Sequence, residues 1–152
     1  QLHFAFSMVD QHGLKKHGRG GFTCHICVLR PKSVGSVKLA DANPNSPPLI
    51  DPAFLKDERD LDTMLAGVKQ AQQIMQAPSF DAHRGKALYA GASNDDEELK
   101  EDIRNRADTI YHPVGTCKMG PDSDPNAVVD QRLRVRGIKS LRVPEIQMPH
   151  RS

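Results

Sequence analysis

The strongest constraint on the fold is a helical repeat of apolar residues that begins after Asp57 and stops before Pro78. Its apolar side chains recur at steps of three and four residues, which places them on one face of a helix. Asp57 has the side chain of an N-cap residue, and Pro78 cannot continue a helix. We therefore expect an amphipathic helix whose apolar face covers a sheet. The repeat consists of Leu61, Leu65, Val68, Ala71 and Met75.

Three stretches that favour strands precede this helix. Apolar residues mostly alternate over residues 2–9, the pattern resumes over 22–29, and 36–39 form a short third stretch. A polar, glycine-rich connection over residues 10–21 separates the first two stretches. The proline-rich residues 43–48 are expected to form an extended loop.

A second helix and several short strands follow. The helix is expected to begin with Ser93 as its N-cap, in an approximate capping box with Asp96, and to end near Arg106 or Asp108. Strands, then helices, then strands predict an α+β fold, a mostly antiparallel sheet with helices covering one face. The late stretches that favour strands are 109–119, 128–129, 133–135 and 141–143.

The composition is typical of one globular domain. The chain has 152 residues, 38% of them hydrophobic, and a mean hydropathy of −0.55. A formal charge of +2 with interspersed signs and only 5% aromatic residues argue against a nucleic-acid partner. No apolar run approaches the ~18 residues of a membrane span, and the first residues lack the profile of a signal peptide. We expect a cytoplasmic protein, and the missing initiator methionine suggests a piece of a longer chain.

Cys24 and Cys27 have the spacing of zinc and thiol-redox motifs. Side chains three residues apart in a strand point to opposite faces, so these thiols would not meet on one ion. No second pair follows at zinc-ribbon spacing. We therefore expect no metal site and interpret both cysteines as small buried hydrophobic residues. A small zinc protein built on this pair is the alternative that a metal assay would remove.

The glycines of residues 17–21 do not complete a nucleotide motif. A GxGxxG motif would need glycine where Thr23 stands, with a helix rather than a strand after it. We expect a loop there. His3 and His25 lie in predicted strands and are expected to be packing or edge residues.

His112 differs from the other histidines in its surroundings. Pro113 fixes its own φ and pushes His112 into an extended conformation, while Gly115 would allow the backbone to approach another group closely. A backbone restrained in this way suits an imidazole that exchanges protons near neutral pH. From the residues alone, a catalytic and a structural role remain open. We expect His112 at the end or edge of a strand, with its ring on the open face of the sheet.

Residues 109–120, TIYHPVGTCKMG, resemble the signature of the C-terminal, substrate-binding domain of the glucose-methanol-choline (GMC) oxidoreductases. The likeness continues in order through residues 30–37, 48–52 and 128–137 and covers nearly the whole chain. Within that family, the chain is most similar to bacterial choline dehydrogenases and FAD-dependent alcohol dehydrogenases.

The resemblance implies that His112 is the catalytic base beside the flavin. It would take the hydroxyl proton of an alcohol while the substrate carbon delivers hydride to FAD. Residues 1–152 would then be the substrate-binding domain of an enzyme that oxidises choline or another primary alcohol to an aldehyde, in contact with the FAD domain of the parent chain. Cys117 is expected to pack. The sequence ranks choline and aliphatic alcohols level and leaves membrane association of the parent enzyme open.

The chain also departs from the family pattern. The dinucleotide-binding fingerprint is missing, so we expect the isolated chain to hold no flavin and to be inactive alone. Residues 143–152 form an atypical tail, in which Glu145 is the candidate for the flavin-contacting acid, only with the FAD domain present. The alternative function is a non-catalytic binding domain that associates with itself through an exposed sheet face.

Overall fold

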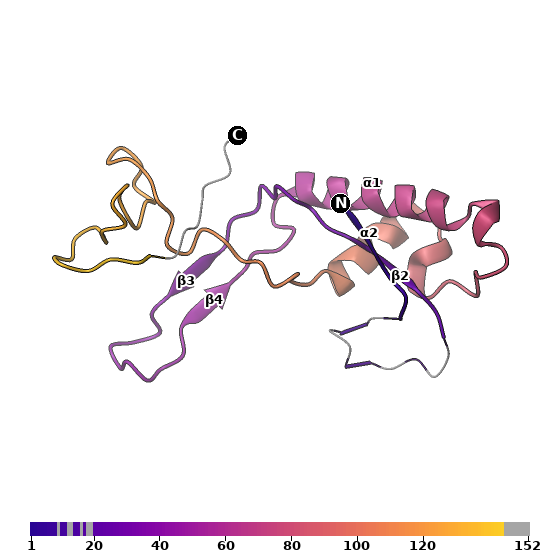
Figure 1. The fold of residues 1–152 in the computed structure, drawn as a ribbon, viewed down its shortest axis with the longest axis horizontal. Helices are drawn as coiled ribbons and strands as arrows, with labels where there is room; N and C mark the ends of the chain where they lie inside the picture. Colours follow the sequence, from indigo (N-terminus) through magenta and orange to yellow (C-terminus); the bar gives the residue numbers. More distant parts are fainter. Residues whose placement is uncertain (9, 12–13, 16, 18–19, 145–152) are drawn as a thin grey trace. The chain divides into compact units, whose positions relative to one another are not determined.

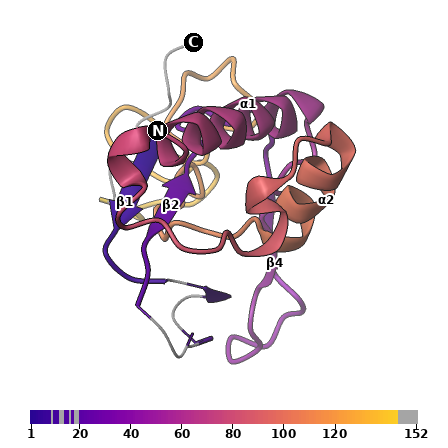
Figure 2. The ribbon, with the colours of Figure 1, turned by 90° about the vertical axis from the view of Figure 1, so that its right-hand side faces the viewer.

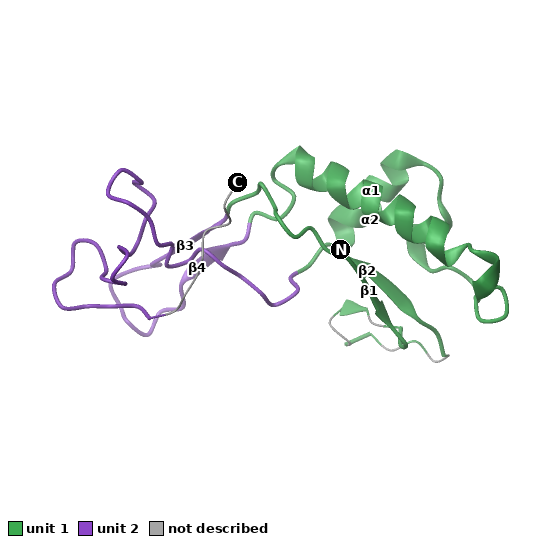
Figure 3. Cartoon of the chain, turned by 45° about the horizontal axis from the view of Figure 1, so that its top comes forward, with its two compact units in different colours: residues 1–34, 53–108 green, residues 35–52, 109–152 purple. Residues whose placement is uncertain are grey.

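The computed structural model describes residues 1–8, 10–11, 14–15, 17 and 20–144 and divides the chain into two compact units (Figure 1; Figure 3). Unit 1 comprises Gln1–Val34 and Ala53–Asp108, and unit 2 comprises Gly35–Pro52 and Thr109–Ser152. The described residues form two α-helices and short antiparallel strands, which confirms the α+β class. These strands make two separate two-stranded sheets where we expected one.

The sheet of unit 1 pairs β1 (Leu2–Ala5) with β2 (Thr23–Ile26) in antiparallel orientation. Both strands lie inside the predicted stretches and are shorter than predicted. His3 lies directly opposite His25 in the register. At the open end, Gln1 and Cys27 exchange two backbone hydrogen bonds, each 2.8 Å long.

Helix α1 (Glu58–Met75) forms where the apolar repeat predicts it. Asp57 is the N-cap, as expected, and its carboxylate accepts a hydrogen bond from the backbone N–H of Arg59 at 3.0 Å. After α1 the chain enters a short 3-10 turn, η2 (Pro78–Phe80). Neither α1 nor any other helix of the described residues is long and apolar enough to cross a membrane.

The apolar face of α1 packs against helix α2 (Asp96–Arg106) and the 3-10 turn η3 (Tyr89–Ala92) (Figure 1). We expected this face to cover the sheet, which is wrong for Leu61, Leu65 and Val68. A helical repeat shows that a face is buried but does not show which element buries it. The core consists of Leu61, Leu65, Ala90, Leu99 and Ile103, with Val68 packed at its edge.

A different side of α1 contacts strand β2 (Figure 2). The contact is close because Gly67 has no side chain: a Cβ placed there would lie 2.6 Å from Cγ2 of Ile26. The helix therefore makes a close approach to the sheet at a glycine, a position outside the predicted apolar repeat.

Helix α2 begins two residues later than predicted. Asp95, not Ser93, is the N-cap, and its carboxylate accepts hydrogen bonds from the backbone N–H groups of Glu97 at 2.8 Å and Glu98 at 3.4 Å. The hydroxyl of Ser93 instead accepts the N–H of Asp95 at 3.2 Å. Both side chains are good caps, and the sequence pattern does not rank neighbouring candidates. The helix ends at Arg106, as predicted.

A buried carboxylate joins the segment after β2 to the start of α1. Asp60 is only 4% exposed. It accepts hydrogen bonds from the backbone N–H groups of Lys32 and Ser33, both at 2.8 Å. The hydroxyl of Ser33 accepts the N–H of Asp57 at 3.0 Å. These bonds fix the course of the chain where it leaves unit 1.

Unit 2 contains the antiparallel pair of β3 (Ser36–Lys38) and β4 (Leu49–Asp51). The sequence predicts β3 but no strand at β4. Gly35 is required at the base of this pair, because a Cβ there would overlap the carbonyl oxygen of Asp51.

Turns interrupt the strands that we expected after residue 109. Leu133 and Ser140 adopt left-handed backbone conformations, with φ of 62° and 60°, and these break the extended runs. Val129 is the best-buried residue of this region, at 1% exposed. The predicted strands are reduced to single bridges, which join Met119 to Val129, Val129 to Val135 and Arg134 to Arg142.

Candidate functional site

His112 lies in unit 2, in irregular backbone that precedes the bridge at Met119. The expected position at the end or edge of a strand is therefore wrong. The residue is exposed, and it makes no hydrogen bond or ion pair with the described residues. Its imidazole is thus open to a molecule arriving from outside the chain.

The backbone on either side of His112 is shaped by two left-handed residues. Tyr111 has a φ of 65° and donates its N–H to Oγ1 of Thr109 at 2.9 Å. Gly115 has a φ of 93°, and its carbonyl oxygen accepts the N–H of Lys118 at 3.2 Å. A Cβ on Gly115 would meet nothing within 4 Å. Glycine is therefore favoured at this position because of its positive φ. No described residue makes the close approach to the backbone that we expected there.

The end of this segment is anchored to the centre of unit 2. The carbonyl oxygen of Lys118 accepts the N–H groups of Val128 at 2.8 Å and Val129 at 3.2 Å. The ammonium of Lys118 lies 2.6 Å from the carboxylate of Asp124 and lowers the pKa of that carboxyl. Cys117 is half-buried, in keeping with a packing role. His112 is therefore held by a segment that is fixed downstream and open at the imidazole.

A polar cluster in unit 1 was missed by the sequence analysis, which assigned residues 10–21 to a loop. The carboxylate of Asp10, whose side chain is 7% exposed, accepts a hydrogen bond from the hydroxyl of Tyr89 and lies 3.2 Å from Nε2 of His17. The Tyr89 hydrogen bond is the largest cause that lowers the pKa of Asp10 to about 2. The guanidinium of Arg106 lies 3.6 Å from the centre of the Tyr89 ring. This cluster joins the loop after β1 to η3 and α2.

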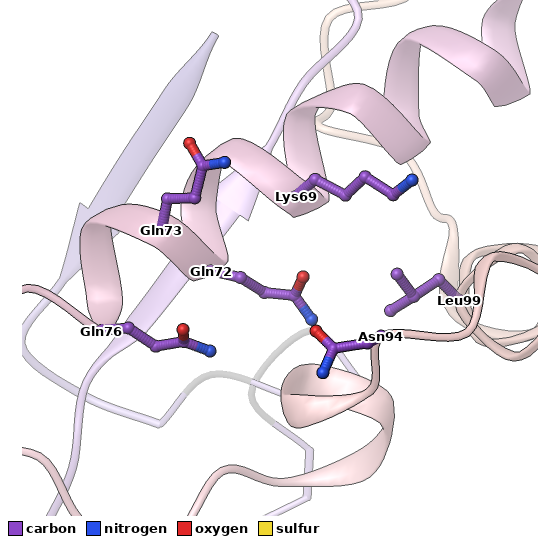
Figure 4. Close-up of a pocket in the computed structure, with 6 residues that line it drawn as sticks. All are labelled: Lys69, Gln72, Gln73, Gln76, Asn94 and Leu99. Atoms are coloured by element: carbon purple, nitrogen blue, oxygen red, sulfur yellow. The ribbon is translucent and has the colours of Figure 1, made fainter.

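A hollow of about 210 Å³ opens between α1 and the residues that lead into α2 (Figure 4). Its polar groups already bind one another across the helices: Gln72 donates to the carbonyl oxygen of Ser93 at 2.9 Å, and Lys69 lies 2.6 Å from the carboxylate of Asp96. The hollow therefore belongs to the packing of α1 on α2, and the ammonium of Lys69 that lines it is already paired with Asp96. It is lined by Lys69, Gln72, Gln73, Gln76, Asn94 and Leu99.

Cys24 and Cys27 are half-buried rather than fully buried, and they form no disulfide. Partial burial raises the pKa of the Cys24 thiol, which keeps it protonated and unreactive. Among the described residues, no three His, Cys, Asp or Glu side chains are placed to hold a metal ion together.

The helix N-termini of this chain do not fit the pyrophosphate of a flavin dinucleotide. A helix N-terminus binds phosphate through free N–H groups and a positive field. At α1 the first N–H groups face Asp57, with Glu58 and Asp60 in the first turn. At α2 they face Asp95, and three further acids follow. Both ends repel an anion. Glu145, the proposed flavin contact, lies outside the described residues.

Comparisons with known proteins give this arrangement its context. The family model for GMC oxidoreductases matches residues 31–146. Over 94% of its length, the chain is 48% identical to an alcohol dehydrogenase [acceptor] of Pseudomonas putida and 40% identical to the mitochondrial choline dehydrogenase of Homo sapiens. It spans only 26% and 24% of those proteins.

Solved structures give the same context. A formate oxidase of Aspergillus oryzae, studied for its FAD modification, matches 88% of this chain with a TM-score of 0.71 at 26% identity, over 24% of its own length. A pyridoxine 4-oxidase from Mesorbium loti matches 66% of this chain with a TM-score of 0.59 at 33% identity, over 19% of its own length. Because the family model covers most of the chain, including the segment that carries His112, the chain belongs to the GMC oxidoreductase family.

Proposed function

We propose that residues 1–152 are the substrate-binding domain of an FAD-dependent oxidoreductase that acts on a primary alcohol. The relatives named above are alcohol and choline dehydrogenases, and they support this class of substrate. His112 acts as the base that accepts the hydroxyl proton of the alcohol as it is oxidised to an aldehyde. The isolated chain is inactive, because it supplies only the substrate side of the reaction.

The observation that carries this proposal is the exposed imidazole on an anchored segment. A general base must reach its substrate and be held in position. His112 has no competing hydrogen bond among the described residues, so its nitrogens are available to an alcohol. The turn closed by Gly115 and the hydrogen bonds of Lys118 fix the backbone on one side of it.

The described residues take part in proton transfer and not in holding the cofactor. Neither helix N-terminus fits a pyrophosphate, so we assign no step at the flavin to the described residues. In this proposal FAD is held by the remainder of a longer protein. Glu145 stays a proposed contact to the flavin in that protein.

The test is a substitution of His112 in a full-length enzyme that contains this chain. His112→Ala is expected to leave FAD bound and to lower kcat by about 10²- to 10⁴-fold, the range for loss of a general base. Turnover is measured with choline and with an aliphatic primary alcohol, which also identifies the substrate.

The matched control is His83→Ala, which removes another exposed imidazole, in unit 1. This variant should keep wild-type kcat. Wild-type turnover in His112→Ala would show that the backbone conformation imposed by Pro113 and Gly115 serves folding alone.

A second candidate function is self-association through β3 and β4. The side chains of Val37 and Ile50, which lie opposite each other in this pair, are 49% and 67% exposed. Clustered apolar side chains of this kind favour partners. Sedimentation of the chain tests this function: a dimer that Ile50→Ser dissociates would support it, and a monomer at all concentrations would remove it.

A further inference from the structure

His3 and His25 face each other across the sheet of β1 and β2. Gln1 and Cys27, two residues further along, exchange both backbone hydrogen bonds. By the alternation of an antiparallel pair, His3 and His25 are again a hydrogen-bonded pair, with Cα atoms about 5.5 Å apart. Side chains at such positions lie on the same face, with Cβ atoms about 4.5–5.5 Å apart. The two imidazoles therefore project side by side.

One nitrogen of this pair lacks the partner that its burial requires. Nε2 of His3 is buried and has no hydrogen-bond partner among the described residues. Buried polar atoms are nearly always paired, so we expect this nitrogen to bind a partner from outside the described residues. The neutral imidazole is the form that binds metal ions.

The face that carries the two histidines lies on the side of the sheet away from α1. Ile26 points toward Gly67 of α1, and successive side chains of a strand alternate between faces. His25 therefore lies on the face away from α1. It is also exposed, which gives an ion a route to the pair.

We propose that His3 and His25 together bind a divalent transition-metal ion of the zinc type through their imidazole nitrogens. In a tetrahedral zinc site with bonds of about 2.0–2.1 Å, two nitrogens lie about 3.3 Å apart. Imidazoles on facing Cβ atoms reach this separation by rotation about their side-chain torsions. Such an ion would supply the missing partner of Nε2 of His3. With two protein ligands, the remaining positions are open to water or to another molecule.

The test is a titration of the chain with Zn²⁺ by calorimetry. The N-terminal amine is acetylated first, so that it contributes no ligand beside His3. We expect one Zn²⁺ per chain, with affinity that falls at acidic pH as the imidazoles take up protons. His3→Gln and His25→Gln should each weaken zinc binding by more than about tenfold. Loss of a group that only orients a metal ligand already weakens metal binding by about this much. Mg²⁺, which prefers oxygen ligands, should not displace the zinc ion.

Three control variants separate this site from others. His83→Gln removes an exposed imidazole elsewhere in unit 1 and should leave the affinity unchanged. Cys24→Ser and Cys27→Ser should also bind zinc as the wild type does.

Circular dichroism and the melting temperature establish that the variants are folded. ¹⁵N spectra of the wild-type imidazoles should show zinc-dependent shifts at both His3 and His25. Absence of binding, binding that survives His3→Gln or His25→Gln, or loss only in a cysteine variant would overturn the proposal.

Discussion

Unit 1 buries a small apolar core between two helices, whereas the described part of unit 2 is built from the short β3–β4 pair, loops and single bridges. Of the eight buried apolar residues in the described part of the chain, six belong to unit 1, and Ala127 and Val129 belong to unit 2. In unit 2 the backbone is fixed by hydrogen bonds at Lys118 and by turns, and large apolar side chains remain exposed. The difference indicates that packing determines the conformation of unit 1, and that polar contacts determine the conformation of the segment that presents His112.

The largest effect on stability is expected from the core of unit 1. Leu99 is 2% exposed and lies at the centre of the contact between α1 and α2. Leu99→Ala should lower the free energy of unfolding by about 2–5 kcal/mol, through lost burial and the cavity left behind. Urea denaturation measures the change. A loss below 1 kcal/mol would show that the core of unit 1 does not dominate its stability, and the contrast with unit 2 would fail.

The next effect is expected at the carboxylate that fixes the exit from unit 1. Asp60→Asn replaces a charged acceptor of two backbone N–H groups and should cost about 1.5–3 kcal/mol. The control is Asp62→Asn, an exposed acid on the same helix, which should change stability little.

The same carboxylate predicts a dependence on pH. Burial opposes ionisation of Asp60, but hydrogen bonds from Ser33 and Lys32 outweigh it and lower its pKa. Its contribution is therefore fully present above the ordinary carboxyl pKa and is lost as pH falls through the lowered value. Between neutral and acidic pH, the free energy of unfolding should therefore fall less in Asp60→Asn than in the wild type. Parallel losses in the two proteins would contradict this account.

The two units also differ in how far the sequence predicts them. The apolar repeat and Asp57 locate α1, because a helix is encoded by side chains close in sequence. The partner of its apolar face depends on contacts between distant segments, and neither Gly67 nor Asp60 shows its role in a local pattern.

In unit 2 the sequence pattern predicts longer strands after residue 109 than the structure contains. Residues such as Val129 favour strands locally, but the left-handed turns at Leu133 and Ser140 are not marked by glycine. The residue types draw attention to the segment around His112, but the left-handed conformation of the adjacent Tyr111 is not marked by glycine.

A smaller effect is expected in the polar cluster of unit 1. Tyr89→Phe removes the hydroxyl that contributes most to holding the pKa of Asp10 at about 2. The pKa of Asp10 should then rise toward the ordinary value of 3.8, as followed by NMR of its carboxyl carbon. The stability that Asp10 contributes would be lost at a higher pH on acidification. Tyr111→Phe in unit 2 is the control, and an equal shift of Asp10 in that variant would contradict the assignment.

The smallest effect is expected on the exposed apolar surface of unit 2. Leu39 is 85% exposed, so its side chain gains little burial on folding. Leu39→Ser should therefore change the free energy of unfolding by less than about 0.5 kcal/mol, as substitutions at exposed positions do. Leu61→Ser, at a position only 5% exposed, is the matched control in unit 1 and should be strongly destabilising. A large loss in Leu39→Ser, measured at a protein concentration where the chain is monomeric, would mean that this leucine is buried in solution. Unit 2 would then have a core of its own, and the difference between the units would be one of size rather than of kind.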